Sequence, residues 1–156
     1  MNDSNPPTEA GSGQPTATQP VQGAALAEDL YRLLRLKTNP ICMKLFERVQ
    51  DMEAVPKIRR PQAILTTDQV VGQAARLGFT VGVTAADLVG PQCGAVLGLV
   101  PQDAEWRSGK KLAGVWFATQ EDAAAHQAAM HCVPYGKYTA MAVSPLASGR
   151  LTDPDI

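Results

Sequence analysis

Aromatic residues are scarce in this sequence, and long apolar runs are missing from it. Only 5% of the 156 residues are aromatic, so leucine, valine, alanine and methionine must fill the core. No apolar run approaches the roughly 20 residues that a membrane-spanning helix needs. The formal net charge of −1 argues against a general nucleic-acid-binding protein, because such proteins have a strongly basic surface. We therefore expect neither a membrane nor nucleic acid as a partner.

Cysteine is also rare, with single residues at Cys42, Cys93 and Cys132 and no Cys-x-x-Cys pair. The odd number and wide spacing argue against a disulfide framework and favour a reducing cytoplasm. The same spacing argues against a self-contained zinc or iron–sulfur motif, so no metal site is predicted. The N-terminus lacks the charged and apolar regions of a secretory signal. The sequence identifies no cofactor.

The composition changes near residue 25. Residues 1–24 are mostly small and polar and include many prolines and glycines, so we expect a disordered tail. Residues 25–156 are long enough for a single domain with its own core. The first helix is expected over residues 25–36, where five leucines recur at near-helical spacing.

The remaining periodicity predicts an α+β fold. Strands are expected over residues 41–46, 79–84 and 138–143, where apolar and polar residues alternate. Further helices are expected over residues 61–77, 103–106 and 119–131, and a polar surface loop over residues 47–60. We predict a small mixed sheet packed by helices. The chain stops at Asp155-Ile156, which resembles the start of another strand, so the sheet is expected to be incomplete.

Several single residues give sharper expectations. Thr66 or Thr67 and Thr119 are candidate helix N-caps, and Gly78 is a helix terminator. The alternation from Phe79 to Thr84 predicts a strand buried on one face. Gly82, inside that strand, indicates a bulge or a close approach of another part of the chain.

The stretch from Phe79 to Leu99 is the most informative part of the sequence. It is expected to form a strand, a tight turn at Gly90-Pro91, and a small-residue helix that opens at Cys93. Unpaired N–H groups and the positive end of the helix dipole would converge at that turn, which suits an anion or a metal ligand. The candidate ligand-binding residues of the turn are Gly90, Gln92, Cys93 and Gly94.

Cys93 has two interpretations. Free cysteine is among the most buried residue types, so Cys93 is either a small buried hydrophobe or a thiolate activated by the helix N-terminus. A catalytic thiolate would need a base, and the candidates are His126, His131, Asp68, Asp87 and Cys132. No spacing among them brings these groups together. Lys44, in the first strand, is either a cation facing a ligand or a solvated strand lysine.

Several short motifs occur here in an order that matches a known family. They are Leu36 to Phe46, Ala75 to Gly78, Cys93-Gly94-Ala95 with Leu97-Gly98-Leu99, and Val143 to Leu146 with Pro154-Asp155. With these motifs the chain resembles the N-terminal half of the family called domain of unknown function 169.

The resemblance implies a fold and a site rather than a reaction. Members of the family are uncharacterised, are typically longer, and continue with a strand after Pro-Asp. By that resemblance this chain is expected to be a fragment, a truncated gene product or one subunit of a split protein. Members often have a Cys-Gln pair where this chain has Asp68-Gln69, which adds Gln69 to the candidate ligand-binding residues. The missing thiol weakens an iron–sulfur interpretation.

Two functional hypotheses follow. In the first, the protein is a binding subunit that holds a small anionic or cofactor-like ligand at the Gly90 to Gly94 turn. It would associate with itself or with a partner chain through its incomplete sheet. In the second, it is a thiol-dependent enzyme or a redox or metal protein that uses Cys93.

Overall fold

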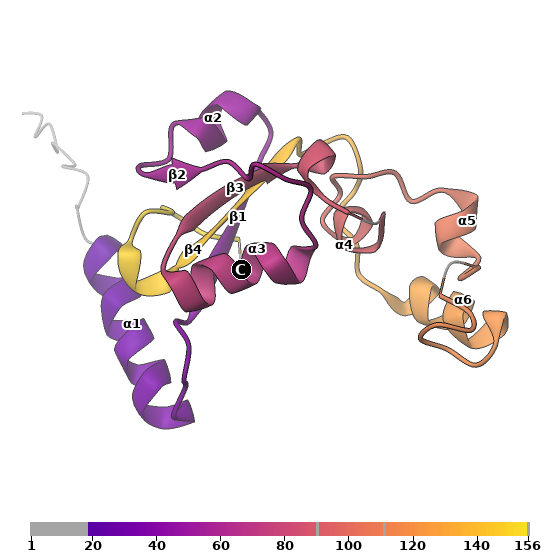
Figure 1. Ribbon diagram of the computed structural model, residues 1–156, viewed down its shortest axis with the longest axis horizontal. Coiled ribbons are helices and arrows are strands. Elements are labelled where there is room, and N and C mark those ends of the chain that lie inside the picture. Colours follow the sequence, from indigo (N-terminus) through magenta and orange to yellow (C-terminus); the bar gives the residue numbers. More distant parts are fainter. Residues whose placement is uncertain (1–18, 90, 111, 156) are drawn as a thin grey trace, which may run out of the picture.

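The structure is a computed structural model that describes residues 19–89, 91–110 and 112–155. A mixed sheet lies at its centre, with helices on both faces and a helical lobe to one side (Figure 1). The elements in chain order are α1 (Gln19–Leu34), β1 (Ile41–Phe46), α2 (Val49–Glu53), β2 (Ile58–Arg59), α3 (Thr67–Leu77), β3 (Thr80–Thr84), the 3-10 helix η1 (Ala85–Asp87), α4 (Pro91–Val96), α5 (Ala104–Arg107), α6 (Gln120–Ala129), β4 (Ala140–Pro145) and the 3-10 helix η2 (Leu146–Ser148). The predicted α+β class and open mixed sheet are confirmed.

The four strands have the order β1-β4-β3-β2. β4 is antiparallel to both of its neighbours, and β2 is parallel to β3. β1 and β4 pair along six positions, from Ile41 opposite Pro145 to Phe46 opposite Ala140. The two edges of the sheet are therefore a six-residue strand, β1, and a two-residue strand, β2.

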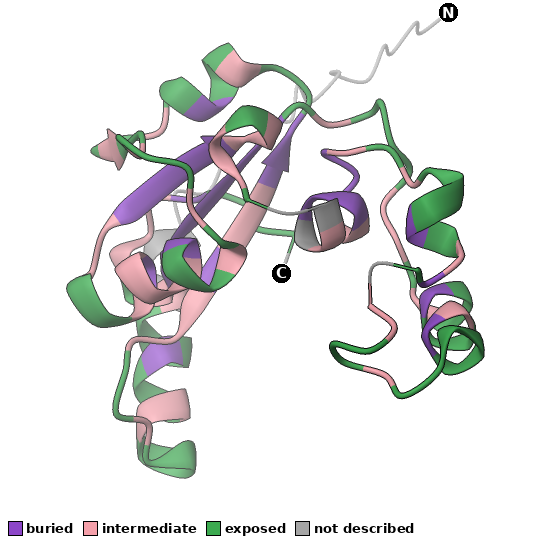
Figure 2. Ribbon diagram, turned by 45° about the vertical axis from the view of Figure 1, so that its right-hand side comes forward, coloured by how far each residue is buried: buried purple, intermediate pink, exposed green. Residues whose placement is uncertain are grey.

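Each face of the sheet carries its own hydrophobic cluster. On one face, Val70 and Ala74 of α3 pack on Val81, Val83 and Met141 of the strands. On the other face, the buried Met52 of α2 belongs to a second cluster with alternate residues of β1 and β4. Figure 2 shows the buried residues concentrated in the strands and sparse in the lobe formed by α5 and α6.

The prediction that strand 79–84 is buried on one face only was wrong. Thr80 to Val83 are all buried, because β3 lies between β4 and β2 and has helices over both faces. Gly82 does permit a close approach, as predicted: a Cβ atom there would lie 2.5 Å from Ile58 Cδ1 and 2.7 Å from Met52 Sδ.

The predicted helix signals are confirmed. Thr66 caps α3 by accepting a hydrogen bond from the backbone N–H of Gln69, and the Gln69 side chain accepts from the N–H of Thr66. Gly78 ends the helix in the left-handed conformation, with φ of 72°. Thr119 caps α6 by accepting from the N–H of Asp122.

Two segments differ from expectation. Residues 47–60, predicted to be a polar loop, contain α2 and β2, which contribute Met52 and Ile58 to the second hydrophobic cluster. The two elements are too short to show a hydrophobic period in the sequence. The third predicted strand begins at Ala140 instead of at Tyr138, so Tyr138 does not share a face with Ala140 and packs against the cluster under α3.

The first helix begins earlier than predicted, at Gln19, and residues 1–18 of the expected tail lie outside the described residues. Its leucines are largely exposed, with Leu33 at 68% and Leu34 at 61%. The buried contact comes instead from Ala27 and Gly23, and a Cβ atom at Gly23 would lie 3.0 Å from the Leu146 carbonyl oxygen of η2. Small residues thus allow α1 to rest on η2.

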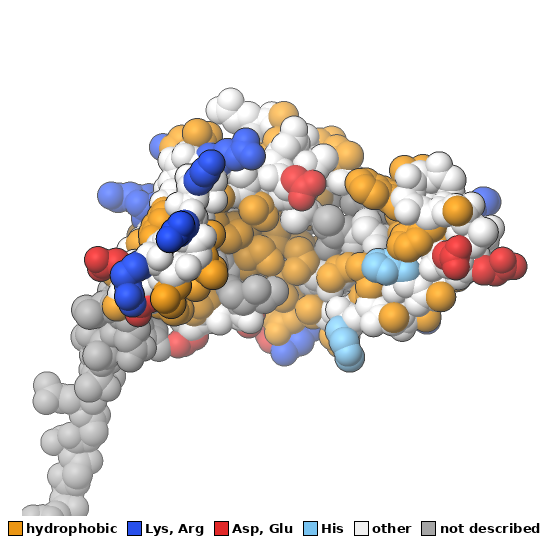
Figure 3. Space-filling model, turned by 90° about the horizontal axis from the view of Figure 1, so that it is seen from below, with side chains coloured by type: hydrophobic (Ala, Val, Ile, Leu, Met, Phe, Trp, Pro, Cys, Tyr) orange, Lys and Arg blue, Asp and Glu red, His pale blue; other side chains and the backbone are white. Residues whose placement is uncertain are grey.

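Hydrophobic side chains gather on the side of the molecule seen in Figure 3, between the sheet with α3 and the lobe that carries the two histidines. Among the described residues, no helix combines the length and the apolar character that crossing a bilayer requires.

Candidate functional site

The turn singled out in the sequence leads into α4. The helix begins at Pro91, two residues before the predicted start, because proline is favoured at the first helical position, where its missing N–H costs no hydrogen bond. Cys93 is therefore the third residue of the helix. Gly90 lies outside the described residues, and so does the side chain of Cys93.

Gly94 has a packing role in the structure. Its carbonyl oxygen accepts hydrogen bonds from the N–H groups of Leu99 and Val100, which folds the chain back after α4. A Cβ atom at Gly94 would lie 2.6 Å from Cγ2 of Val100. The absence of a side chain is thus required for the chain reversal, and this contact is separate from any role in ligand binding.

Gln92 joins α4 to the helical lobe. Its Nε2 atom donates to Oε1 of Gln127 at 3.0 Å, and Nε2 of Gln127 donates to Oε1 of Gln92 at 2.9 Å. Gln127 is only 4% exposed, and its Nε2 atom also donates to the carbonyl oxygen of Trp106. Among the predicted ligand-binding residues whose side chains are described, Gln92 is the one that contacts the lobe.

A cavity of about 310 Å³, with Gln127 in its lining, lies between α5 and α6. Its lining combines hydrogen-bond donors, a thioether and a thiol, from Gln102, Trp106, Arg107, Gln127, Ala128, Met130 and Cys132. In the part of the chain that the structure describes, the exposed guanidinium of Arg107 has no acidic partner. A cavity with a free cation at its rim and amide groups in its wall suits a small anion.

The indole of Trp106 adds a further feature of this region. The side chain is 4% exposed, and its Nε1–H has no hydrogen-bond partner among the described residues. An unpaired buried donor is costly, so this position favours a bound acceptor such as a water molecule. Nothing in the sequence signals it, because the burial depends on α6, which lies many residues further along the chain.

The other two predicted ligand-binding residues make structural contacts elsewhere. Lys44 donates from Nζ to the carbonyl oxygen of Thr152, on the face of the sheet that α2 covers. Gln69 lies in α3, over the opposite face, and is engaged in the capping box with Thr66. The structure therefore places Lys44, Gln69 and Gln92 in three separate regions.

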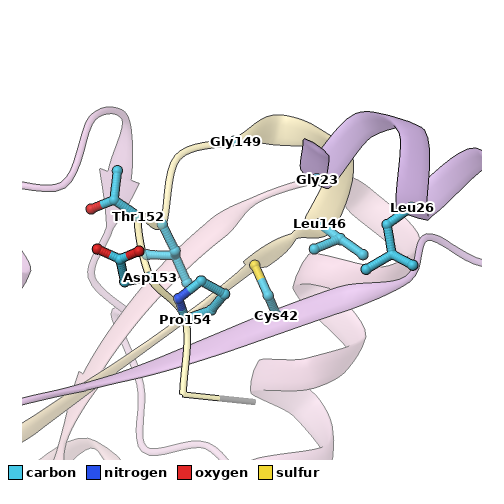
Figure 4. Close-up of a pocket in the computed structure, with 9 residues that line it drawn as sticks. Gly23, Leu26, Cys42, Leu146, Gly149, Thr152, Asp153 and Pro154 are labelled. Carbon is cyan, nitrogen blue, oxygen red and sulfur yellow. The ribbon is translucent and has the colours of Figure 1, made fainter. Parts of the chain in front are cut away.

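A second cavity, of about 230 Å³, lies beside Cys42 (Figure 4). It is lined by α1, β1, η2 and the loop that follows η2, with mostly apolar groups from Gly23, Leu26, Cys42, Leu146, Gly149, Leu151, Thr152, Asp153 and Pro154. Burial raises the pKa of the Cys42 thiol, which is 4% exposed and donates to the carbonyl oxygen of Ser144 at 3.6 Å. This thiol is therefore a poor nucleophile.

Buried hydroxyl groups fix the loop that forms one wall of this second cavity. Thr80 Oγ1 and Ser144 Oγ lie 2.8 Å apart, and Ser144 Oγ lies 2.8 Å from Ser148 Oγ. Arg150, in the loop, donates from Nη1 to Thr80 Oγ1 at 2.9 Å. Together with the bond from Lys44 to Thr152, these contacts tie the loop to the sheet.

The groups considered as bases for Cys93 are not gathered into one site. Burial alone would raise the pKa of Asp87, but hydrogen bonds from Thr84 and from the Arg60 guanidinium outweigh it and lower the pKa. The ring of His126 contacts Phe117, with 4.9 Å between centroids. Within the described residues, no group of three or more His, Cys, Asp and Glu side chains could hold a metal ion.

Comparison with known protein families gives a match. The sequence model of the family called domain of unknown function 169 (DUF169), described as Uncharacterised ArCR, matches residues 29–156. The chain belongs to the DUF169 family. No curated protein and no solved structure matches it. Because the DUF169 description names no activity, the function of this DUF169 protein has to be argued from its site.

Proposed function

We propose that this DUF169 protein is a cytoplasmic binding subunit that holds a small anionic ligand beside α4 and associates with a further polypeptide through its open sheet. The observation that carries the ligand half is the reciprocal amide pair of Gln92 and Gln127. It connects the predicted Gly90 to Gly94 turn to the wall of the cavity lined by Arg107.

The charge distribution supports an anion in this cavity. Arg107, like Arg59 and Arg76, has no ion pair within the described ranges, and of these three it is the one that lines this cavity. Gln102 donates its Nε2–H to the carbonyl oxygen of Ala95, at the end of α4, and also lines the cavity. A carboxylate or phosphate group would supply the acceptor that the guanidinium lacks.

Native mass spectrometry tests the ligand half. Wild type, Arg107→Gln and the control Arg76→Gln, which changes an exposed arginine on α3, would be purified without oxygen from the natural source. We expect extra mass that is lost on denaturation in the wild type and the control, and its loss from Arg107→Gln. Absence of extra mass in the wild type, or its retention in Arg107→Gln, would contradict the proposal.

The alternative is a thiol-dependent enzyme or redox protein that uses Cys93. It is favoured by one observation: α4 begins at Pro91, so Cys93 lies in the first helical turn, where backbone N–H groups lack helical partners. Alkylation with iodoacetamide at neutral pH distinguishes the two functions. Labelling of Cys93 much faster than that of a free cysteine peptide favours the enzyme, and slower labelling favours the binding subunit.

A further inference from the structure

Two cations differ in burial from all the other lysines and arginines that the structure describes. Lys44 of β1 and Arg150, in the loop after η2, are half-buried, whereas every other described lysine and arginine is exposed. Neither of the two forms an ion pair with a described residue. Removing a charge from water without a counter-ion is costly, so these two positions favour the binding of an anion.

Both cations line the same cavity. It has a volume of about 380 Å³ and lies on the face of the sheet that α2 covers, between β1, α2 and the loop after η2. Two like charges in the wall of one cavity repel each other, and an anion bound between them converts this repulsion into two attractions. Lys44 was a predicted ligand-binding residue, and the structure adds Arg150 as its companion.

Neutral groups hold both cationic side chains in place. Arg150 donates from Nη1 to Oγ1 of Thr80 at 2.9 Å, and Lys44 donates from Nζ to the carbonyl oxygen of Thr152. The backbone N–H of Arg150 also donates to Oγ of Ser148, which fixes the start of the side chain. These partners carry no net charge, and both cations have further N–H donors. Donors that are already positioned lose little entropy when they bind a ligand.

The carboxylate of Asp51 also lines this cavity. Its two oxygens accept hydrogen bonds from the guanidinium of Arg48 at 2.6 Å and 2.8 Å, and these bonds lower the pKa of Asp51. Arg48 thus neutralises Asp51, which forms no ion pair with Lys44 or Arg150. The charge that remains uncompensated in the described lining is therefore positive.

We infer that this cavity binds a phosphate monoester, with its phosphoryl group between Lys44 and Arg150. A phosphoryl group carries a charge of about −1.5 to −2 near neutral pH, which matches two cations. The planar guanidinium of Arg150 presents parallel N–H groups to two phosphoryl oxygens, and the ammonium group of Lys44 adds a compact charge.

The rest of the cavity suits the organic part of such an ester. Phe46, Val55 and Pro56 give it an apolar wall, and small-molecule sites combine such walls with a few placed polar groups. No residue lines both this cavity and the cavity beside Arg107. The site is therefore separate from the anion site of the proposed function and goes beyond it.

Isothermal titration calorimetry of the full chain with phenyl phosphate, after dialysis, tests this inference. Lys44→Met and Arg150→Gln each remove one charge, and Arg76→Gln, an exposed arginine of α3, is the control. We expect the first two variants to bind about tenfold more weakly or worse, by the usual strength of a hydrogen bond to a charged group. The control should bind as the wild type does.

A second pair of variants keeps both cations, because Lys44 and Arg150 also hold the loop in place. Ala54 is exposed at the end of α2 and lines the cavity. Ala54→Glu adds a negative charge at the rim, and Ala54→Gln adds a side chain of the same size without the charge. We expect Ala54→Glu to bind phenyl phosphate about three- to tenfold more weakly than Ala54→Gln, because the added carboxylate repels the phosphoryl group.

Amide chemical shifts of the wild type locate the bound phenyl phosphate. We expect changes at Lys44, Leu151 and Thr152 and none in α6. Absence of binding by the wild type, or equal binding by Ala54→Glu and Ala54→Gln, would overturn the inference. Binding that Arg107→Gln abolishes, with shifts in α6 instead, would also overturn it but would support the proposed function, which the native mass measurement tests separately.

Discussion

Gln92 and Gln127 form a closed pair of amide groups, each donating to the other, at 3.0 Å and 2.9 Å. The pair joins α4, which follows the sheet, to α6 of the lobe across 35 positions of sequence. Both side chains are removed from solvent to some extent, and Gln127 almost completely. The lobe is therefore held in place by polar contacts as well as by apolar packing.

This pair predicts an interaction energy that a double-mutant cycle can measure. Gln127→Ala should lower the free energy of unfolding by about 1–3 kcal/mol, because it leaves buried partners unsatisfied. Adding Gln92→Ala should cost less in that background than in the wild type, by about 0.5–1.5 kcal/mol. Urea unfolding gives these values, with the exposed Gln62→Ala as a control. Strict additivity of the two substitutions would show that the amide pair contributes nothing.

Two glycines give opposite expectations for the same substitution. Gly82→Ala should destabilise the protein by about 1–3 kcal/mol, because its Cβ would overlap Ile58 and Met52. Gly72→Ala, inside α3 with nothing within 4 Å of the new Cβ, should stabilise it by about 0.5–1 kcal/mol. Thermal unfolding of both variants tests the prediction. A stable Gly82→Ala protein would mean that α2 is not packed on the sheet as described.

The two thiols whose side chains are described should differ in reactivity. Burial raises the pKa of Cys42, so little thiolate forms at neutral pH, and access to the sulfur is blocked. Cys132 is partly exposed. We expect iodoacetamide to label Cys132 in the native protein and Cys42 only after urea is added, as peptide mass spectrometry would show. Labelling of Cys42 in the native protein as fast as that of Cys132 would indicate that the cavity beside Cys42 opens.

Asp87 predicts a pH-dependent contribution to stability. Its pKa in the folded protein is lowered by Thr84 and Arg60 despite burial, while the value in the unfolded chain is about 3.9. A lowered pKa stabilises the fold above the unfolded value, and this stability is lost as pH falls through the folded value. Asp87→Asn should cost about 1–2 kcal/mol at pH 7, because hydrogen bonds to a charged group contribute about 1.5–3 kcal/mol and those to a neutral group about 0.5–1.5 kcal/mol.

The cost of Asp87→Asn should shrink as the pH falls below about 4, where the wild-type carboxylate also becomes protonated. Urea unfolding at a series of pH values measures the difference between the two proteins. Asp68→Asn, in the first turn of α3, is the matched control, because Asp68 is exposed. A cost of Asp87→Asn that stays constant down to pH 3 would show that hydrogen bonding alone, without charge, carries the effect.

The features that the sequence predicted correctly depend on neighbours in the chain. The capping box of Thr66 and Gln69 spans three residues, and the alternation in β1 is complete within six. β2 was missed because two residues carry no period, and Gly82 could be recognised only because a glycine is conspicuous inside a strand. The exposure of Leu33 and Leu34 could not be foreseen, because helical spacing does not reveal whether another element covers the apolar side.

The candidate site was harder to predict for the same reason. Gln92 was selected for its place in the turn. Its partner Gln127 lies in a helix whose sequence does not mark Gln127 as the buried polar residue. Lys44 and Gln69 were selected singly, and tertiary packing engages each in a separate structural contact. The cavity beside Arg107 requires α5 and α6 to pack together, and no local pattern describes that packing.

The place of β4 in the sheet has a consequence for biosynthesis. β4 lies between β1 and β3, although it is translated after the other described strands, and bonded residues such as Cys42 and Ser144 are 102 positions apart. On the ribosome, β1 and β3 must wait without their shared neighbour until residue 145 has left the exit tunnel. Contacts of such long range are slow to form, and unpaired strands aggregate readily. The nascent chain should therefore depend on chaperones until β4 has emerged from the ribosome.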